Sequence, residues 1–278
     1  MVVVGCGDIG SRVAQLMQGH GWQVYGLRRN IQRLPAGIVP IAADLNQAQC
    51  PSDWPQEPID YVVYAMAAQG MSEADYQRAY VQGQQHLYSW LQHYQQQPKR
   101  VIFVSSSAVY GQNDDSWVDE QSPTEPKRWS GQIMLAAERC AMESGHPATA
   151  VRLTGIYGPG RNMLIERVRQ GYHAPHRHCF TNRIHADDAA SLIATIMLAD
   201  AQGQTIESVY IGVDNEPAEQ AEVVAWLQQQ LKVSSVAGLV LQPRSGSKRC
   251  SNARARALGW SAQYSSYREG YAVQLAEL

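Results

Sequence analysis

Short apolar runs alternate with amphipathic stretches through the first part of the chain, as far as about Ile156. The runs are rich in Val, Ile and Tyr, and in the stretches between them apolar residues recur with the period of a helix. Strands that alternate with helices in this way are typical of a parallel sheet. We expect strands at Met1–Val4, Gln23–Leu27, Val39–Ala42, Tyr61–Tyr64, Val101–Val104 and Thr149–Leu153, and helices at Ile9–Gly19, Glu73–Tyr94 and Gly131–Glu143.

The rhythm changes after Gly158. The next stretch, residues 159–183, is rich in Arg, His, Gly and Pro and predicts irregular structure. Beyond it we expect a helix at Ala186–Leu198, a strand at Ser208–Val213, a helix at Ala218–Leu231, and a polar segment over 242–260 before a last helix.

The pattern predicts an α/β fold: a Rossmann-type doubly wound parallel sheet with a small C-terminal substrate lobe. The expected domains are a cofactor-binding Rossmann domain over 1–157 and a mixed region over 158–278. The second region is too small for a large independent fold, so we expect it to combine the substrate lobe with elements that pack back on the sheet.

A glycine-rich turn with the spacing GxGxxG follows the first expected strand and opens the first expected helix. The first glycine permits a tight turn, the second lets the backbone approach a pyrophosphate, and the third allows the helix to pack closely on the strand. The helix N-terminus adds unpaired N–H groups and partial positive charge. The alternative is a purely structural turn. The residues expected to bind a dinucleotide here are Gly5, Gly7, Asp8, Ile9 and Gly10.

The second expected strand ends in two adjacent arginines, Arg28 and Arg29. Rossmann proteins that bind NAD usually carry an acidic residue at this place, where it accepts hydrogen bonds from the ribose 2′-hydroxyl. A guanidinium suits a 2′-phosphate, which an acid would repel. The pair therefore predicts NADP as the cofactor, with two solvated surface charges as the alternative.

Other strand ends supply the rest of the expected cofactor site. Asp44 and Leu45 follow the third strand, where they would meet the adenine edge, although Asp44 is equally suited to cap the following turn. Small residues close the fourth strand, as a backbone that runs beside a cofactor requires. The further cofactor-binding residues are Ala65, Met66, Ala67 and, at the end of the fifth strand, Ser105.

Composition excludes some partners. The net charge of −2, with no run of basic residues, argues against nucleic acid or a membrane surface. Five cysteines, without close pairs or metal-ligand spacing, favour a reducing compartment and no metal site. The sequence contains no long apolar run that would span a membrane. We therefore expect a cytoplasmic protein with a small-molecule substrate.

Three further segments make a resemblance specific: Val101–Gly111, with its serine-rich turn; Arg152–Gly160; and Arg183–Asp188. They resemble the fifth strand, a strand-end loop and the foot of the substrate lobe in the extended short-chain dehydrogenases/reductases, the superfamily of NAD-dependent epimerases and dehydratases. Leu258–Trp260 and Tyr267–Gly270 are similar too. This resemblance covers almost the whole chain in the right order, and it implies a Rossmann fold with a nicotinamide cofactor.

Enzymes of that family hold a Ser or Thr, a Tyr and a Lys around the nicotinamide, with the tyrosine hydroxyl as general acid or base. The resemblance places the catalytic hydroxyl at Ser106. The tyrosine and lysine positions, however, fall on Ser130 and Met134, and a shift by one residue gives Trp129 and Ile133, which are no better. The usual proton chemistry therefore does not carry over to this sequence.

Tyr157, in the loop that the family places beside the nicotinamide, is the remaining candidate for a catalytic proton donor. It would equally pack against the cofactor or line the cleft. Ser130-Gly131 and the short C-terminal lobe resemble the atypical short-chain dehydrogenases of the bacterial YeeZ type. These are commonly described as NAD(P)-dependent epimerases or dehydratases.

Two classes of function remain open. One is an NADP-dependent oxidoreductase or epimerase-like enzyme that uses Ser106; the other is a catalytically silent NADP(H)-binding regulatory or redox-sensing protein. The family also implies a homodimer formed through helices 73–94 and 131–143, although their apolar faces would suit a core. A cluster of basic residues indicates either an anionic ligand or a solvated loop. Its members are Arg167, Arg169, His173, His176, Arg177, His178 and Arg183.

Overall fold

The computed structural model describes residues 1–175, 177–242 and 246–278, and the chain forms two compact units. Each unit is assembled from three separate stretches of the chain. The domain boundary that we expect after Tyr157 stays a prediction. Unit 1 comprises Met1–Val109, Pro126–Arg152 and Ala190–Tyr210, and unit 2 comprises Tyr110–Glu125, Leu153–Ala189 and Ile211–Leu278.

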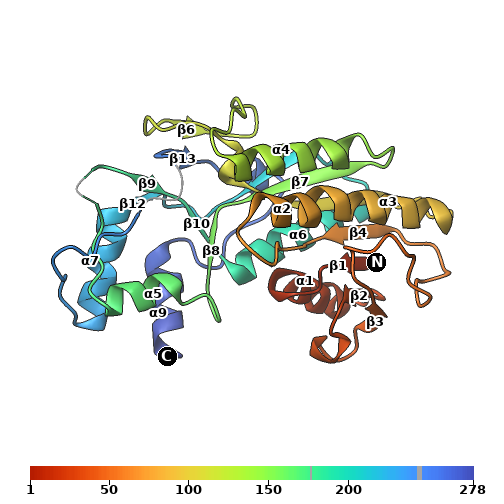
Figure 1. Cartoon of the computed structure of the whole chain (residues 1–278), viewed down its shortest axis with the longest axis horizontal. Helices are drawn as coiled ribbons and strands as arrows, with labels where there is room; N and C mark the ends of the chain where they lie inside the picture. The colour runs from red at the N-terminus through yellow and green to blue at the C-terminus, as the bar shows by residue number, and fades with distance from the viewer. Residues whose placement is uncertain (176, 243–245) are drawn as a thin grey trace. The chain divides into compact units, whose positions relative to one another are not determined.

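A central sheet, seven-stranded within the described part of the chain, carries the fold (Figure 1). Its strand order is β11-β7-β5-β4-β1-β2-β3, and β1 pairs in parallel with both β2 and β4. The order therefore reverses beside β1, which is the switch point at which Rossmann folds bind ligands. The strands are β1 Val2–Val4, β2 Tyr25–Arg28, β3 Val39–Ala42, β4 Tyr61–Tyr64, β5 Arg100–Ser106, β7 Ala148–Leu153 and β11 Val209–Gly212.

Burial explains why these segments form strands. All three residues of β1 and all four of β4 are buried, as expected for central strands of a parallel sheet that is covered on both faces. The edge strand β3 differs, because three of its four residues are exposed and it contains Pro40, which cannot donate to a ladder. The expected doubly wound α/β fold is confirmed.

Helices cover the sheet. Figure 1 shows α2, α3 and α4 side by side, and their helix-to-helix contacts agree with this view. The single helix expected at Glu73–Tyr94 is confirmed as one continuous rod, except that its middle is a π-helical turn, η2. The elements are α1 Asp8–Gly19, η1 Ile31–Arg33, α2 Glu73–Tyr76, η2 Gln77–Gln82, α3 Gly83–His93, η3 Ser107–Val109, α4 Trp129–Met142 and α6 Ala186–Ala201.

Unit 2 is built from short strands and helices. The expectation of irregular structure over 159–183 is wrong in part, because a helix, α5, occupies Met163–Arg169 and two strands follow. Only Ile165 and Val168 of α5 are buried, so its apolar pattern is too brief to be recognised in the sequence. The elements are β6 Trp117–Val118, β8 Gly155–Tyr157, β9 Phe180–Thr181, β10 Arg183–His185, β12 Ala218–Glu219, α7 Gln220–Leu231, β13 Arg249–Cys250, α8 Ala253–Ala257 and α9 Tyr267–Ala276.

Asp214 is a buried carboxyl group in unit 2, with 2% of its surface exposed. One oxygen accepts a hydrogen bond from the backbone N–H of Glu216 (3.1 Å), whereas Oδ2 has no partner among the described residues. Burial raises the pKa of Asp214 to about 8, although Arg183 acts in the opposite direction and Asp188 in the same one. The native protein therefore holds a proton at neutral pH that an exposed aspartate would release.

This proton makes stability depend on pH. The folded-state pKa of Asp214 lies above its unfolded value, so its contribution is complete below about pH 4 and is lost as the pH rises through about 8. Relative to Asp214→Asn, the free energy of unfolding of the wild type should fall by up to about 1.4 kcal/mol per pH unit across this window. Urea unfolding of both proteins at several pH values measures the difference. Parallel profiles would contradict the prediction.

No helix within residues 1–175, 177–242 and 246–278 is long and apolar enough to cross a bilayer.

Candidate functional site

The glycine turn of unit 1 is pressed against the end of β4. Gly5 has a φ of +81°, and a Cβ atom there would lie 2.8 Å from both Ala65 O and Met66 N. A Cβ atom at Gly10 would lie 2.5 Å from Gly5 O, so α1 packs directly on the turn. Gly7 differs, because its nearest neighbour would be 3.9 Å away. Gly5 and Gly10 are thus required for packing, whereas Gly7 borders open space.

The N-terminus of α1 points into this open space. Gly7 N–H donates to Gly5 O (2.7 Å), and Ser11 N–H donates to Gly7 O (2.9 Å), which begins the helix. Within the described chain, no side chain caps the N-terminal turn. The end of α1 therefore keeps the partial positive charge and N–H groups that attract anions.

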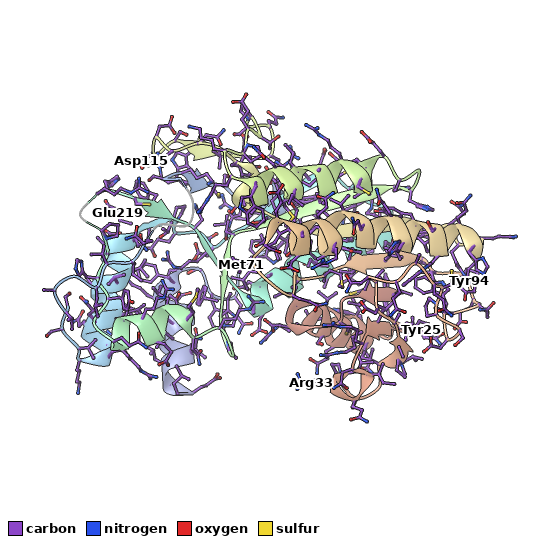
Figure 2. All side chains as sticks on the ribbon, viewed as in Figure 1. Tyr25, Arg33, Met71, Tyr94, Asp115 and Glu219 are labelled. Atoms are coloured by element: carbon purple, nitrogen blue, oxygen red, sulfur yellow. The ribbon has the colours of Figure 1, made fainter. Side chains whose placement is uncertain are left out.

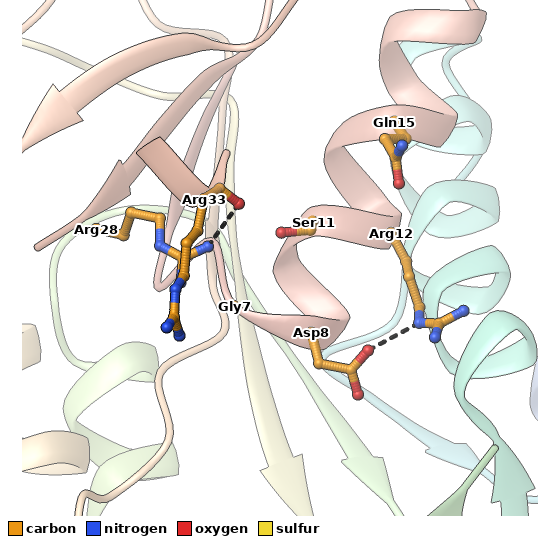
Figure 3. A pocket seen from close by; sticks show the side chains of 7 residues that line it. All are labelled: Gly7, Asp8, Ser11, Arg12, Gln15, Arg28 and Arg33. Carbon is orange, nitrogen blue, oxygen red and sulfur yellow. Dashed lines mark hydrogen bonds and ion pairs between the residues drawn. The ribbon is translucent and has the colours of Figure 1, made fainter. Parts of the chain in front are cut away.

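A pocket of about 460 Å³ lies in front of this helix end (Figure 3). Arg28 reaches over it and donates from Nη1 to Arg33 O (2.9 Å). On the opposite side, Arg12 Nε donates to Asp8 Oδ1 (2.9 Å). Three guanidinium groups and one carboxylate therefore surround the pocket, whose lining residues are Gly7, Asp8, Ser11, Arg12, Gln15, Arg28 and Arg33.

Two of these arginines were not identified from the sequence. Arg33 ends η1, a short turn that Asn30 caps by accepting a hydrogen bond from Gln32 N (3.2 Å), and this turn brings Arg33 back beside Arg28. The signal that would have found it is an asparagine cap directly after the strand. Arg29, by contrast, is exposed and is not among the described residues that line the pocket.

Asp44 and Leu45 lie after β3. Asp44 Oδ1 accepts from the backbone N–H of Asn46 (3.1 Å) and from its side-chain amide (2.9 Å), so the carboxylate closes its own turn. Leu45 is buried, and its carbonyl oxygen lies 2.7 Å from His86 Nδ1. The capping role considered for Asp44 is therefore present, and contact of either residue with adenine stays a prediction.

Ser105 belongs to a buried polar network in unit 1. Its hydroxyl donates to Glu138 Oε1 (2.5 Å). The same carboxylate receives Arg152 Nε at 2.9 Å and Nη2 at 2.7 Å, a two-pronged ion pair with about 6% of each side chain exposed. The hydroxyl of Ser105 thus ties β5 to α4, which the sequence did not predict.

Ser106 is half-buried at the end of β5, and its Oγ accepts from Ala108 N (3.2 Å). Helix α4 packs against this serine turn, since a Cβ atom at Gly131 would collide with Ala108 O. Ser130 and Met134 stand on the first turns of α4, and Met134 is buried. Unit 1 therefore brings the expected catalytic hydroxyl to α4, the helix to which the resemblance assigns the tyrosine and lysine positions.

Tyr157 lies in the core of unit 2, with 3% of its surface exposed. Its hydroxyl donates to Ser266 O (3.4 Å), and its ring packs against Tyr271 with centroids 4.5 Å apart. Burial raises the pKa of Tyr157 well above its usual value. These contacts are those of a core tyrosine, and its role as a proton donor stays a prediction.

The basic stretch of unit 2 is distributed over several elements. Arg183 is buried in β10 and donates to Thr181 Oγ1 (2.8 Å), while Arg169 pairs with Glu166 (2.9 Å) on α5. His178 lies between two carboxylates, 2.9 Å from Glu219 and 3.3 Å from Asp115, which Figure 2 labels. His176 lies outside the described residues. No cluster of His, Cys, Asp and Glu with metal-binding geometry occurs in the part of the chain that is described.

Fold and site together define a Rossmann-type α/β protein with an uncapped helix N-terminus at its switch point. The NAD dependent epimerase/dehydratase family matches residues 1–212, so the chain belongs to this family. A solved structure from Methylobacillus flagellatus, described as a candidate NAD-dependent epimerase/dehydratase, is 33% identical. It has a TM-score of 0.80 and covers 99% of this chain, with 97% of its own length matched.

Two other relatives are more distant. Protein YeeZ of Escherichia coli K12 is 27% identical over 210 residues, which are 73% of this chain and 74% of that protein. A UDP-glucose 4-epimerase of Thermus thermophilus, solved with NAD, is 19% identical, with a TM-score of 0.78 over 99% of this chain and 97% of its own length. At that identity the likeness establishes only the fold. The expected family membership and YeeZ likeness are confirmed.

Proposed function

We propose that the protein binds NADP(H) and acts as an oxidoreductase or epimerase-like enzyme on a small molecule. The observation that carries the proposal is the pocket at the end of α1, where Arg28 and Arg33 face an uncapped helix N-terminus. The open side of Gly7 leaves room for a pyrophosphate, and the helix end attracts its charge. Arg28 ends β2, the strand whose end meets the ribose in dinucleotide-binding Rossmann proteins, and it contacts Arg33.

The charges in the pocket favour a phosphorylated ribose. An exposed 2′-hydroxyl needs an acceptor, and no acid follows Arg28 or Arg29 before the turn of η1. The acid that does line the pocket, Asp8, is held by Arg12. A guanidinium offers several fixed N–H donors, which suit the oxygens of a phosphate. We therefore assign the 2′-phosphate to Arg28 and Arg33.

When bound, NADP(H) supplies or accepts a hydride at its nicotinamide ring. Ser106 would polarise the substrate oxygen there, as the family's hydroxyl does. A second candidate function is supported by the resemblance, which assigns the tyrosine and lysine positions of the family to Ser130 and Met134 of α4. The protein would then be a catalytically silent NADP(H) sensor. Oxidation of NADPH with a panel of carbonyl compounds separates the two, because a silent protein would show none.

The cofactor assignment is tested by Arg28→Ala combined with Arg33→Ala. Loss of charge-assisted hydrogen bonds of about 1.5–3 kcal/mol should weaken NADPH binding roughly 10- to 100-fold and leave NADH binding within a few-fold. Calorimetric titration with both nucleotides measures this. Arg29→Ala is the matched control, since Arg29 is exposed and outside the pocket lining, and it should change neither affinity by more than a few-fold. Equal losses for NADPH and NADH would refute the assignment of the 2′-phosphate.

A further inference from the structure

The helix on which this family carries its catalytic tyrosine has none here, and Tyr157 lies in the core of unit 2. A carbonyl reduction still needs a proton donor beside the substrate oxygen. The donor has to stand near Ser106, at the carboxyl ends of β4 and β5, because that half of a Rossmann sheet receives the second mononucleotide of the cofactor.

The π-helical turn η2 presents a tyrosine at this edge of the sheet. Such turns are rare and are frequent at functional sites. Here the turn is held by β4, since the hydroxyl of buried Tyr64 donates to the carbonyl oxygen of Ala79 (2.5 Å). Gly83, directly after the turn, leaves room for that hydroxyl, which a Cβ atom there would meet. The fold thus fixes the direction of Tyr80, the residue that follows Ala79.

The hydroxyl of Tyr80 lies against the segment that follows β4. Its oxygen accepts a hydrogen bond from the backbone N–H of Ala68 (3.4 Å). Its own proton has no acceptor among the residues that the structure describes, and the side chain is only half-buried. The ring is braced by Tyr76, whose centroid is 5.2 Å away and which also meets Trp129 at 5.0 Å.

The segments that carry Ser106 and the partner of Tyr80 both follow the last pair of β4 and β5, at the same edge of the sheet. Strands β4 and β5 are parallel neighbours, and their paired residues run from Tyr61 opposite Arg100 to Tyr64 opposite Phe103. Ala68, whose N–H group holds the Tyr80 hydroxyl, follows β4 by four residues, and Ser106 is the last residue of β5. Trp129, which contacts the ring of Tyr76, directly precedes Ser130, the position at which the resemblance expects the catalytic tyrosine.

We propose that Tyr80 is the catalytic proton donor of this protein and replaces the missing tyrosine of α4; the proposal rests on NADP(H) binding as proposed above. In the reduction of a carbonyl compound, the O–H bond of Tyr80 breaks and a new O–H bond forms on the substrate oxygen. The hydride that reduces the carbon comes from bound NADPH. Water then returns a proton to the tyrosinate.

Two features of Tyr80 suit this role. Burial raises the pKa of its hydroxyl, with Tyr76 adding to the effect, so the free protein keeps the proton that it has to donate. The oxidised nicotinamide carries a positive charge, whereas the reduced ring does not. A phenol next to the oxidised ring should therefore ionise more easily, which gives a readout that needs no substrate.

The test is tyrosine ring ¹³C NMR of the wild type, with NADP⁺ or NADPH bound, over a pH range of about 7 to 11. One tyrosine should titrate at least about one pH unit lower with NADP⁺ than with NADPH. That resonance should be absent in Tyr80→Phe and present in Tyr88→Phe, a control on α3 whose hydroxyl bonds to Gln84. Should Tyr80→Phe not fold, nuclear Overhauser contacts to the Tyr76 ring assign the resonance in the wild type.

Each outcome decides the proposal. If both nucleotides bind and no tyrosine pKa falls with NADP⁺, or if the shifted resonance survives in Tyr80→Phe, the proton-donor assignment is wrong and the cofactor proposal stands. If calorimetry shows that neither nucleotide binds, the proposed function itself is wrong and the role of Tyr80 falls with it.

Discussion

Glu138→Gln should lower the free energy of unfolding by about 3–5 kcal/mol, as the loss of one partner from a buried ion pair does. Glu138 accepts three hydrogen bonds, two from Arg152 and one from Ser105, and has 4% of its surface exposed. A neutral amide cannot balance the guanidinium of Arg152, which is buried as well. The amide also places a donor where three donors already point. Urea unfolding of the variant and the wild type measures the loss.

Glu166→Gln is the control for this experiment. Glu166 pairs with Arg169 at 2.9 Å, but 50% of the Glu166 side chain is exposed, so water replaces the pair and the change should be below about 1 kcal/mol. Adding Arg152→Met to Glu138→Gln should recover part of the stability, since no buried charge then remains in this network. A loss below about 1 kcal/mol for Glu138→Gln alone would mean that water reaches the network.

The Ser105 network marks a limit of prediction from sequence. The serine-rich strand end is recognisable locally, although β5 runs to Ser106, two residues beyond the expected end at Val104. The partner of the Ser105 hydroxyl, however, lies 33 residues further along on α4. Nothing in the spacing of Ser105, Glu138 and Arg152 indicates that they meet, because tertiary packing decides it. The cofactor role expected of Ser105 stays a prediction.

Elements that depend on local sequence patterns are predicted correctly, whereas features that depend on backbone detail are not. Strands β1 and β4 follow from continuous apolar runs, and the helix at Glu73–Tyr94 follows from its periodicity. The π turn inside that helix was not predicted, because the sequence on both sides of it is helical and nothing local marks the wider turn. It is the Tyr64 hydroxyl, a residue on another element, that stabilises the wide turn.

The arginines of the pocket show the same contrast between what local sequence predicts and what only the backbone decides. Arg28 was expected to face the cofactor because its place at the strand end is a local signal. Its sequence neighbour Arg29, which is expected there as well, follows the end of β2 in a bend, is exposed, and is not among the described residues that line the pocket. Arg33 enters through the turn η1, and Arg12 enters through the first turns of α1, where it pairs with Asp8. Sequence identified the strand end, and only the structure identified which cations share the pocket.

Gly5→Ala should destabilise the protein and abolish binding of both nucleotides. The left-handed conformation of Gly5, φ +81°, and the 2.8 Å approach of a Cβ atom to Ala65 O and Met66 N act together. Strain of about 1–2 kcal/mol adds to overpacking of about 1–3 kcal/mol, so the free energy of unfolding should fall by about 2–5 kcal/mol. Backbone atoms of β4 cannot move aside as a flexible side chain would, and the displaced turn would no longer present the N-terminus of α1 to a phosphate.

Two other glycines separate packing from binding. Gly7→Ala has room for its methyl group, because the nearest atom lies 3.9 Å away. The substitution should therefore change stability by about 1 kcal/mol or less. It should nevertheless weaken NADPH binding, because the methyl group occupies the space in front of the helix end. Gly19→Ala, at the last residue of α1, meets no atom outside its own chain neighbours and helix within 4 Å, so it should change stability by about 1 kcal/mol or less and leave NADPH affinity unchanged. Thermal unfolding and NADPH calorimetry on the three variants give the comparison. If Gly7→Ala binds NADPH as the wild type does, the phosphate lies elsewhere and the pocket in front of α1 is not the cofactor site.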